Sequence, residues 1–263
     1  MIGRPELSRI AVANGVRERA QEKDYVLTWL LAARAALGPP GLVFKGGTAL
    51  RRCYFSGYRY SEDLDFTAAG AMTEAGVVSA IDAWCEWVYD AAGVRANRKP
   101  VGSPGSTTHY VAYVGPLRAQ DGRDIKIDVA IDEQIRHDDE SRELIREYSD
   151  LPSDLPPLGV YSLTEIWAEK VRSLMQRTEP RDLYDLDRLA IYDDDLPILA
   201  AELFREKARA KGLDPDRLED ILPAREETLR RWWKSRLGNQ VRELPEFDGV
   251  WRRVRRALRQ ARY

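Results

Sequence analysis

Acidic and apolar residues alternate in the segment YSEDLDFT, which spans residues 60–67. In a strand, neighbouring side chains point to opposite faces, so Asp63 and Asp65 would share one face while Leu64 points into a core. Two carboxylates at this spacing can bind one or two Mg²⁺ ions, because hard cations prefer oxygen ligands. A solvated loop with surface acids is the commoner origin of such a pair. The pair alone does not decide between the two interpretations.

A third carboxylate, Asp128, lies in the strongly alternating segment DIKIDVAID at 124–132. Its apolar residues fall on one face, and Asp128 falls on the other together with Lys126. A carboxylate in so apolar a strand needs a partner or a metal, since an unpaired buried charge is costly. If this strand lies beside DLDFTA, Asp128 becomes a third ligand of a two-metal site that can handle a nucleoside triphosphate.

Two glycines follow a short apolar run in LVFKGGTAL at 42–50. At Gly46 and Gly47 the backbone can approach a phosphate without hindrance, and the helix expected next offers N–H groups and a positive dipole end. Thr48 can cap that helix and add a hydroxyl to a phosphate site. The simpler interpretation is a tight turn from strand to helix.

The first half of the chain predicts mixed helices and strands. The expected helices are 18–37 and 71–92, and the expected strands are 42–44, 63–68, 108–117 and 124–132, with a hairpin turn at 121–123. After a proline-rich hinge, LPSDLPPLG, nearly everything reads as helix. We expect an α/β domain at 1–150 and a helical domain at 151–263. The fold class is α/β (α+β), with a mixed sheet flanked by helices.

The helical half contains further charged candidates. Lys170 lies at the edge of an apolar stripe in EIWAEKVRSL, where a lysine that snorkels to solvent is the default interpretation. Asp182 and Asp185 are three residues apart on one helix face and could simply pair with neighbouring arginines of the same helix. Arg177 and Arg181 could instead clamp a triphosphate, since arginine binds phosphate bidentately.

Composition excludes several classes of protein. The chain has 263 residues, 44% of them hydrophobic and 32% charged, which is typical of a folded soluble protein. Its longest apolar run, at 26–37, is interrupted by Arg34 and is too short for a membrane helix, and the N-terminus lacks the apolar segment of a signal peptide. We expect a cytoplasmic protein. The cysteines and histidines stand apart, so neither a disulfide scaffold nor a zinc site is expected: Cys53, Cys85, His109 and His137.

The net charge is −2, but the tail from Arg225 to Tyr263 is rich in arginine and also contains Trp232, Trp233 and Trp251. Such a segment can hold an RNA backbone through arginine and stack bases on indole rings. The alternative is a terminal amphipathic helix with its tryptophans in the core and its arginines in solvent.

The order strand, Gly-Gly, DxD and a single Asp on a later strand is the signature of the nucleotidyltransferase (polymerase-beta-like) fold. More specifically, the chain resembles the AbiEii/AbiGii toxin family, which includes the MenT toxins. Six segments carry the resemblance in this order: EKDYVLTWLLAA, LVFKGGTAL, YSEDLDFT, KIDV, EIWAEKVRSL and RDLYDLDRL. They span residues 22–189, roughly two thirds of the chain.

The resemblance implies roles for individual residues. Asp63, Asp65 and Asp128 would be Mg²⁺ ligands, with Gly46, Gly47 and Thr48 near the nucleotide. Lys170 would contact the nucleotide phosphates. The pattern of a basic residue followed by two aspartates falls on Arg181, Asp182 and Asp185, with arginine where lysine is common. Asp63, Asp65, Lys170, Asp182 and Asp185 are therefore the candidate catalytic residues, and Arg177 joins Arg181 as a candidate nucleotide contact.

The resemblance also implies a function. The chain would be the Mg²⁺-dependent toxin of a toxin–antitoxin or phage-defence system, with a cognate antitoxin protein. It would transfer NMP from an NTP to an RNA acceptor, the expected one being the 3′ end of tRNA, and so block translation. Two alternatives remain: a nucleotidyltransferase acting on a protein or on a small molecule such as an aminoglycoside, and a non-catalytic NTP-binding regulator.

Overall fold

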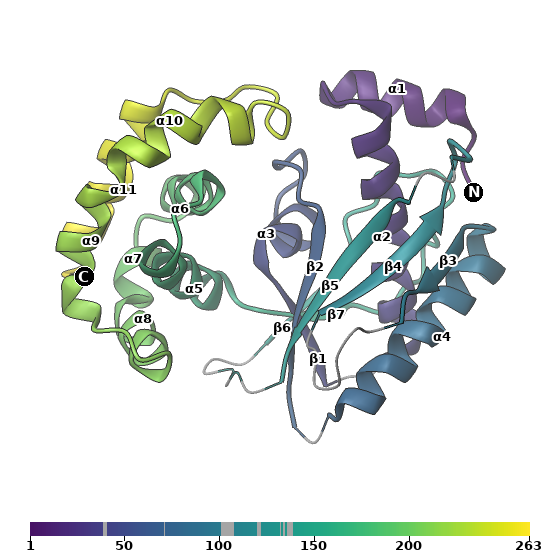
Figure 1. The fold of residues 1–263 in the computed structure, drawn as a ribbon, viewed down its shortest axis with the longest axis horizontal. Helices are drawn as coiled ribbons and strands as arrows, with labels where there is room; N and C mark the ends of the chain where they lie inside the picture. Colours follow the sequence, from purple (N-terminus) through teal and green to yellow (C-terminus); the bar gives the residue numbers. More distant parts are fainter. Residues whose placement is uncertain are drawn as a thin grey trace. The chain divides into compact units, whose positions relative to one another are not determined.

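The computed structural model describes residues 1–38, 41–70, 72–100, 108–119, 122–131, 133, 135 and 139–263 (Figure 1). The chain divides into two compact units, Met1–Val160 and Tyr161–Tyr263. The division falls after the proline-rich segment, whereas the boundary predicted from the sequence lies near residue 150, before it. Each unit is described separately below.

In the described part of the first unit, seven strands form one mixed sheet in the order β3-β4-β5-β2-β1-β7-β6. The strands are β1 (Leu42–Lys45), β2 (Asp63–Ala68), β3 (Arg95–Arg98), β4 (Thr108–Val114), β5 (Asp124–Ala130), β6 (Glu140–Arg142) and β7 (Leu158–Val160). β2 runs parallel to β5 and β1 runs parallel to β7, while the other neighbouring pairs are antiparallel. The four strands expected from the sequence are confirmed, and the mixed sheet confirms the fold class.

Helices α1 (Arg4–Asn14), α2 (Glu18–Leu37) and α4 (Glu74–Ala92) belong to the same unit (Figure 1). The sheet and the long helices share an aromatic core, in which the Phe66 ring of β2 lies 5.7 Å from the Trp84 ring of α4. Trp29 of α2 lies 5.9 Å from Trp87 of α4. The apolar positions of β2 and β5 therefore face these helices, and the acidic positions lie on the opposite face of the sheet.

The second unit is helical, as expected. Its helices are α5 (Leu163–Gln176), α6 (Pro180–Tyr192), α7 (Leu196–Leu199), α8 (Ala201–Ala210), α9 (Leu218–Ala224), α10 (Glu226–Leu237) and α11 (Phe247–Gln260). α6 packs against α5, α10 and α11 (Figure 1). Trp233 and Trp251 are buried, with Phe247 between them at ring distances of 5.6 and 5.9 Å. The interpretation of these two tryptophans as core residues is confirmed. No described helix is both long and apolar enough to span a membrane.

The structure differs from the expected elements in several places, since α1, β3 and β6 were not expected from the sequence. The end of the proline-rich hinge forms β7, which joins the sheet beside β1 because Leu158 and Val160 are apolar and buried. The helix expected at 71–92 begins at Glu74, since the side chain of Thr73 accepts a hydrogen bond from the Gly76 N–H at 3.2 Å and caps it.

Candidate active site

The three predicted metal ligands lie on two neighbouring strands. Because β2 and β5 are parallel, Asp65 lies directly opposite Asp128, and Asp63 lies opposite Lys126. All four positions are half-buried, whereas Leu64 between the two aspartates is fully buried. The condition set by the sequence, that the strand of Asp128 lies beside DLDFTA, is therefore confirmed. The carboxylates share one face of the sheet.

Hydrogen bonds orient Asp128 within this face. Its Oδ1 accepts a hydrogen bond from the Thr108 hydroxyl of β4 at 2.6 Å, and its Oδ2 forms an ion pair with the Lys126 ammonium. Partial burial would lower the pKa of Lys126, but the carboxylates of Asp128, Asp63 and Asp65 raise it. The three acids therefore form one electrostatic cluster around Lys126.

The glycine turn lies against this cluster. Gly46 has a φ of 80°, which disfavours any residue with a side chain, and a Cβ placed there would lie 2.6 Å from Asp65 Oδ2. A Cβ at Gly47 would collide with the Arg59 guanidinium. The short helix α3 (Gly46–Ala49) begins at once after β1. The turn therefore packs its backbone directly against a candidate metal ligand, Asp65, and against Arg59.

Thr48 does not have the position expected for a cap. The N-cap of α3 is Lys45, which makes no side-chain cap, and Thr48 is buried within the helix. Its hydroxyl donates to the Asp63 carbonyl oxygen at 2.6 Å and so fixes the start of β2. The proposed contact between Thr48 and a nucleotide stays a prediction.

A buried ion cluster, which the sequence did not single out, holds the segment that follows the turn. This π-helical segment, Leu50–Tyr54, places Arg51 and Arg52 against the carboxylate of Asp24 from α2. Tyr148 donates a hydrogen bond to the same carboxylate at 2.6 Å. Burial alone would raise the pKa of Asp24, but the two arginines lower it to about 2. No local signal singles out Asp24, because it directly follows the polar residues Gln21, Glu22 and Lys23.

The second unit contains another buried charge cluster, between α5 and α6. The Lys170 ammonium lies 2.9 Å from Asp182 Oδ1 and 2.8 Å from Asp185 Oδ2. All three side chains are buried, so the interpretation of Lys170 as a snorkelling lysine is wrong. Arg177 donates from its Nε to Asp182 Oδ2 at 2.9 Å. Burial would raise the pKa of Asp182, but Lys170 and Arg177 hold it well below its ordinary value.

The two candidate arginines differ in their surroundings. Arg177, at the end of α5, is paired with Asp182 although its side chain is half exposed. Arg181 forms no ion pair with any described residue, and its Nε is buried without a hydrogen-bond partner. Asp185 forms an ion pair with Lys170 of α5. The structure brings together Lys170, Arg177, Asp182 and Asp185 in this unit, and Gly46, Asp63, Asp65 and Asp128 in the other.

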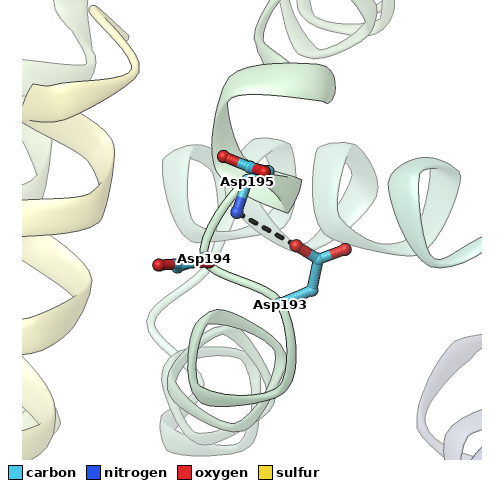
Figure 2. A group of neighbouring side chains, drawn as sticks. All are labelled: Asp193, Asp194 and Asp195. Carbon is cyan, nitrogen blue, oxygen red and sulfur yellow. Dashed lines mark hydrogen bonds between the residues drawn. The ribbon is translucent and has the colours of Figure 1, made fainter.

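A third acidic group lies in the turn between α6 and α7. Figure 2 shows Asp193, Asp194 and Asp195, whose carboxylate oxygens come within 4.8 Å of one another. Among the described residues, these are the only three acids or other ligand residues that approach so closely. The Asp195 N–H donates to Asp193 Oδ1 at 3.0 Å, a bond typical of aspartate in turns. Asp194 and Asp195 are exposed, so turn chemistry and solvation account for this group.

The structure describes one of the two histidines, His109. His109 lies on the apolar face of β4, almost fully buried, and desolvation followed by the charge of Arg98 lowers its pKa. His137 lies outside the described residues.

The face formed by β2 and β5 suits a divalent cation. Its donors are carboxylate oxygens, which Mg²⁺ and Mn²⁺ prefer, and the lysine they surround shows that the position attracts positive charge. The carboxylates are half-buried, which lets an ion and its waters reach them. The residues therefore fit the metal that a nucleotidyltransferase generally uses.

A mixed sheet with paired carboxylates on two parallel strands, beside a glycine turn, defines an enzyme of the nucleotidyltransferase fold. The family described as "Nucleotidyl transferase AbiEii toxin, Type IV TA system" matches residues 29–259, and the chain belongs to this family of nucleotidyltransferase toxins. Its fold is similar to that of MenT4, nucleotidyltransferase toxin Rv2826c from Mycobacterium tuberculosis H37Rv, with a TM-score of 0.74. The two are 24% identical over 98% of this chain and 89% of that chain. No curated protein matches. The resemblance found in the sequence is confirmed.

Proposed function

We propose that this toxin transfers NMP from an NTP to an RNA acceptor in the cytoplasm, in a Mg²⁺-dependent reaction that is kept in check by a cognate antitoxin protein. The expected acceptor is the 3′ end of tRNA, whose modification blocks translation. The observation that carries the proposal is the juxtaposition of Asp65 and Asp128 beside the Gly46 turn. Candidate metal ligands and the predicted phosphate-binding turn then lie side by side.

The proposed reaction is a displacement at the α-phosphorus. The acceptor hydroxyl oxygen forms a bond to this phosphorus, the bond to the β-phosphate oxygen breaks, pyrophosphate leaves, and the hydroxyl proton passes to solvent. Asp63, Asp65 and Asp128 would hold the metal. Mg²⁺, when bound, would neutralise the triphosphate and lower the pKa of the attacking hydroxyl. Such a reaction needs positioning and charge neutralisation more than covalent chemistry by the protein.

Lys170, Arg177 and Arg181 are the candidate nucleotide contacts of the second unit. Asp182 and Asp185 hold Lys170 in a fixed position, and Arg177 shares the charge of Asp182. Arg181, with no acidic partner among the described residues, has a guanidinium able to bind a phosphate bidentately. In this proposal Arg181 is the stronger phosphate contact, and Asp182 and Asp185 act by positioning Lys170.

Incubation with each of four α-³²P-labelled NTPs, together with tRNA and total cell protein, tests the function. We expect label in RNA, dependent on Mg²⁺ and absent when EDTA is added. The proposal is wrong if label enters protein or a small molecule and not RNA. Because the chain belongs to a nucleotidyltransferase family, the non-catalytic alternative is set aside.

The exposed face of α11 favours RNA over the other acceptors. Residues 225–263 contain twelve basic and five acidic residues, although the whole chain has a net charge of −2. On α11, Arg252, Arg256 and Arg259 are exposed, and none of the three forms an ion pair with a described residue. Arg253 instead faces inward and binds Asp187 of α6 at 2.7 and 3.0 Å. α11 is thus fixed to α6 while a row of unpaired guanidinium groups faces solvent, as a phosphate backbone requires.

Stacking of RNA bases on tryptophan is a smaller part of the proposed RNA contact than the sequence alone indicated. Trp233 and Trp251 are in the core, and Trp232 is half-buried with the guanidinium groups of Arg231 and Arg236 5.8 and 5.4 Å from its ring. We therefore propose that the second unit holds RNA through phosphates and not through stacked bases.

Replacing Arg252, Arg256 and Arg259 with glutamine is expected to weaken tRNA binding by about 10²-fold and to reduce the slope of log Kd against log salt by about 2. Filter binding at several salt concentrations measures both. Arg209→Gln, which removes an exposed, unpaired arginine of α8, is the matched control and should leave binding unchanged. Equal binding by the triple variant and the control would exclude the α11 face as the RNA contact.

A further inference from the structure

Lys126 lies among the carboxylates that the proposed function assigns to metal. It is two residues before Asp128 on β5, on the same face of the sheet, and directly opposite Asp63 of β2. Its ammonium forms an ion pair with Asp128 Oδ2. A lysine at this position puts a positive charge where a divalent cation is required.

The charge of Lys126 acts on the whole cluster. Lys126 lies opposite Asp63 and Asp65 lies opposite Asp128, so all four side chains share one half-buried face of the sheet. Lys45, the β1 residue opposite Asp65, has its own acidic partner, because its ammonium lies 2.5 Å from Glu133. Lys126 therefore neutralises the cluster directly, through its ion pair with Asp128.

The Lys126 ammonium is also able to move away from Asp128. Its side chain is 36% exposed, and its flexible stem carries the ammonium toward solvent. Asp128 would keep its orientation without this partner, since Thr108 holds the other carboxylate oxygen at 2.6 Å.

We propose that Lys126 is a resident counter-cation, which neutralises Asp63, Asp65 and Asp128 in the metal-free toxin and competes with the divalent ion for Asp128. This inference rests on the proposed metal site. An ammonium and a divalent cation repel each other at this range, so entry of the ion weakens the pair between Lys126 and Asp128. The released ammonium remains on the face where the triphosphate binds, and it can then contact a phosphate oxygen. Lys126 is thus a positioning residue that links metal binding to nucleotide binding.

Titration of nucleotide-free protein with Mn²⁺, followed by electron paramagnetic resonance of the free ion, tests the competition. Lys126→Met is expected to bind Mn²⁺ about tenfold more tightly than the wild type, a modest effect because the site is half-exposed and screened. Lys126→Arg retains the charge and should stay within about twofold of the wild type. Unchanged or weaker binding by Lys126→Met would overturn the proposal.

Two controls separate this inference from the proposed function. Lys99→Met removes another lysine paired with an aspartate of β5, Asp124 at 2.5 Å, and should not change Mn²⁺ affinity. Asp65→Asn should abolish Mn²⁺ binding. If Asp65→Asn binds Mn²⁺ as tightly as the wild type does, the assignment of the metal site is wrong. If Asp65→Asn loses Mn²⁺ binding while Lys126→Met keeps the affinity of the wild type, only the role of Lys126 is wrong.

A second readout tests the other half of the inference. With metal saturating, Lys126→Met should bind the NTP about tenfold more weakly than the wild type, since one phosphate contact is lost. Fluorescence titration with a labelled, non-hydrolysable NTP measures this. Equal nucleotide affinity in the two proteins would contradict the proposed movement of the ammonium to the phosphates.

Discussion

Replacing Asp65 with asparagine is expected to reduce nucleotide transfer by about 10³-fold or more. Asp65 lies both opposite Asp128 and against the Gly46 turn, so it connects the proposed metal to the proposed phosphate site. Asparagine keeps the shape of the side chain, so β2 should remain intact while one of three negative charges is lost. The labelled-NTP assay, run with equal amounts of folded protein, measures the loss.

The matched control for Asp65→Asn is Glu62→Gln, three residues earlier. The Glu62 side chain is 60% exposed and forms a surface pair with Lys23 at 3.4 Å. Its replacement should leave transfer within about twofold of the wild type, as is usual for such surface positions. The same contrast is expected in cells, where expression of the wild type should arrest bacterial growth and Asp65→Asn should relieve the arrest. Full toxicity of Asp65→Asn would refute the site assignment.

Lys170→Met is expected to affect both stability and activity. Removal of the ammonium leaves two fully buried carboxylates, Asp182 and Asp185, with the half-exposed Arg177 as the remaining cation of the cluster. Removing one partner of a buried ion pair typically lowers the free energy of unfolding by about 3–5 kcal/mol. Chemical denaturation measures this loss, and the transfer assay on the folded fraction should show activity reduced by at least about 10²-fold.

The loss of stability in Lys170→Met should depend on pH in a defined direction. The folded-state pKa of Asp182 in the wild type is lowered, so its charged form contributes stability above the unfolded pKa of about 4, and this contribution disappears as the pH falls through the folded value. In Lys170→Met the Asp182 carboxylate stays buried but has lost the Lys170 ammonium that stabilises its negative charge, so it favours the protonated form. The difference between the two proteins should therefore be largest near pH 7 and should shrink as the pH falls toward 4.

Lys207→Met separates the structural effect of losing a buried lysine from the catalytic one. Lys207 of α8 is similarly buried, and its ammonium lies 2.6 Å from Glu165 Oε1 and 3.6 Å from Glu169 Oε1 of α5, neither of which is a candidate residue. Its replacement should destabilise the second unit by a similar amount, but folded protein should retain its transfer activity. If Lys207→Met and Lys170→Met lose activity in parallel, Lys170 has only a structural role.

The carboxylate pattern on β2 and β5 shows how much of the candidate site can be predicted from the sequence alone. Alternation with a period of two places Asp63, Asp65 and Asp128 on a common face, and that much was predictable. Which residues lie opposite each other depends on register, and no local pattern specifies the register between strands that are far apart in the sequence. The contact between Asp65 and Asp128 therefore required the structure, as did the ion pair that involves Lys126.

The second unit shows a similar limit. Lys170, Asp182 and Asp185 were candidates from the sequence, but their side chains meet through the packing of α5 on α6, which helical periodicity does not encode. Local rules also failed at Thr48, because the helix begins three residues earlier than expected, at Gly46, with Lys45 as its N-cap. Local rules also missed β7, because the neighbouring prolines indicated a hinge and not a strand with two buried apolar residues, Leu158 and Val160.

The position of β7 also sets an order of events during synthesis. β1, which ends at the Gly46 turn, has β2 on one side and β7 on the other, yet Phe44 and its partner Val160 are separated by most of the first unit. A chain that has emerged only as far as residue 150 leaves β1 as an unpaired edge, with its backbone groups open to other chains. The nascent toxin therefore cannot complete the sheet beside the Gly46 turn until Leu158–Val160 have left the ribosome.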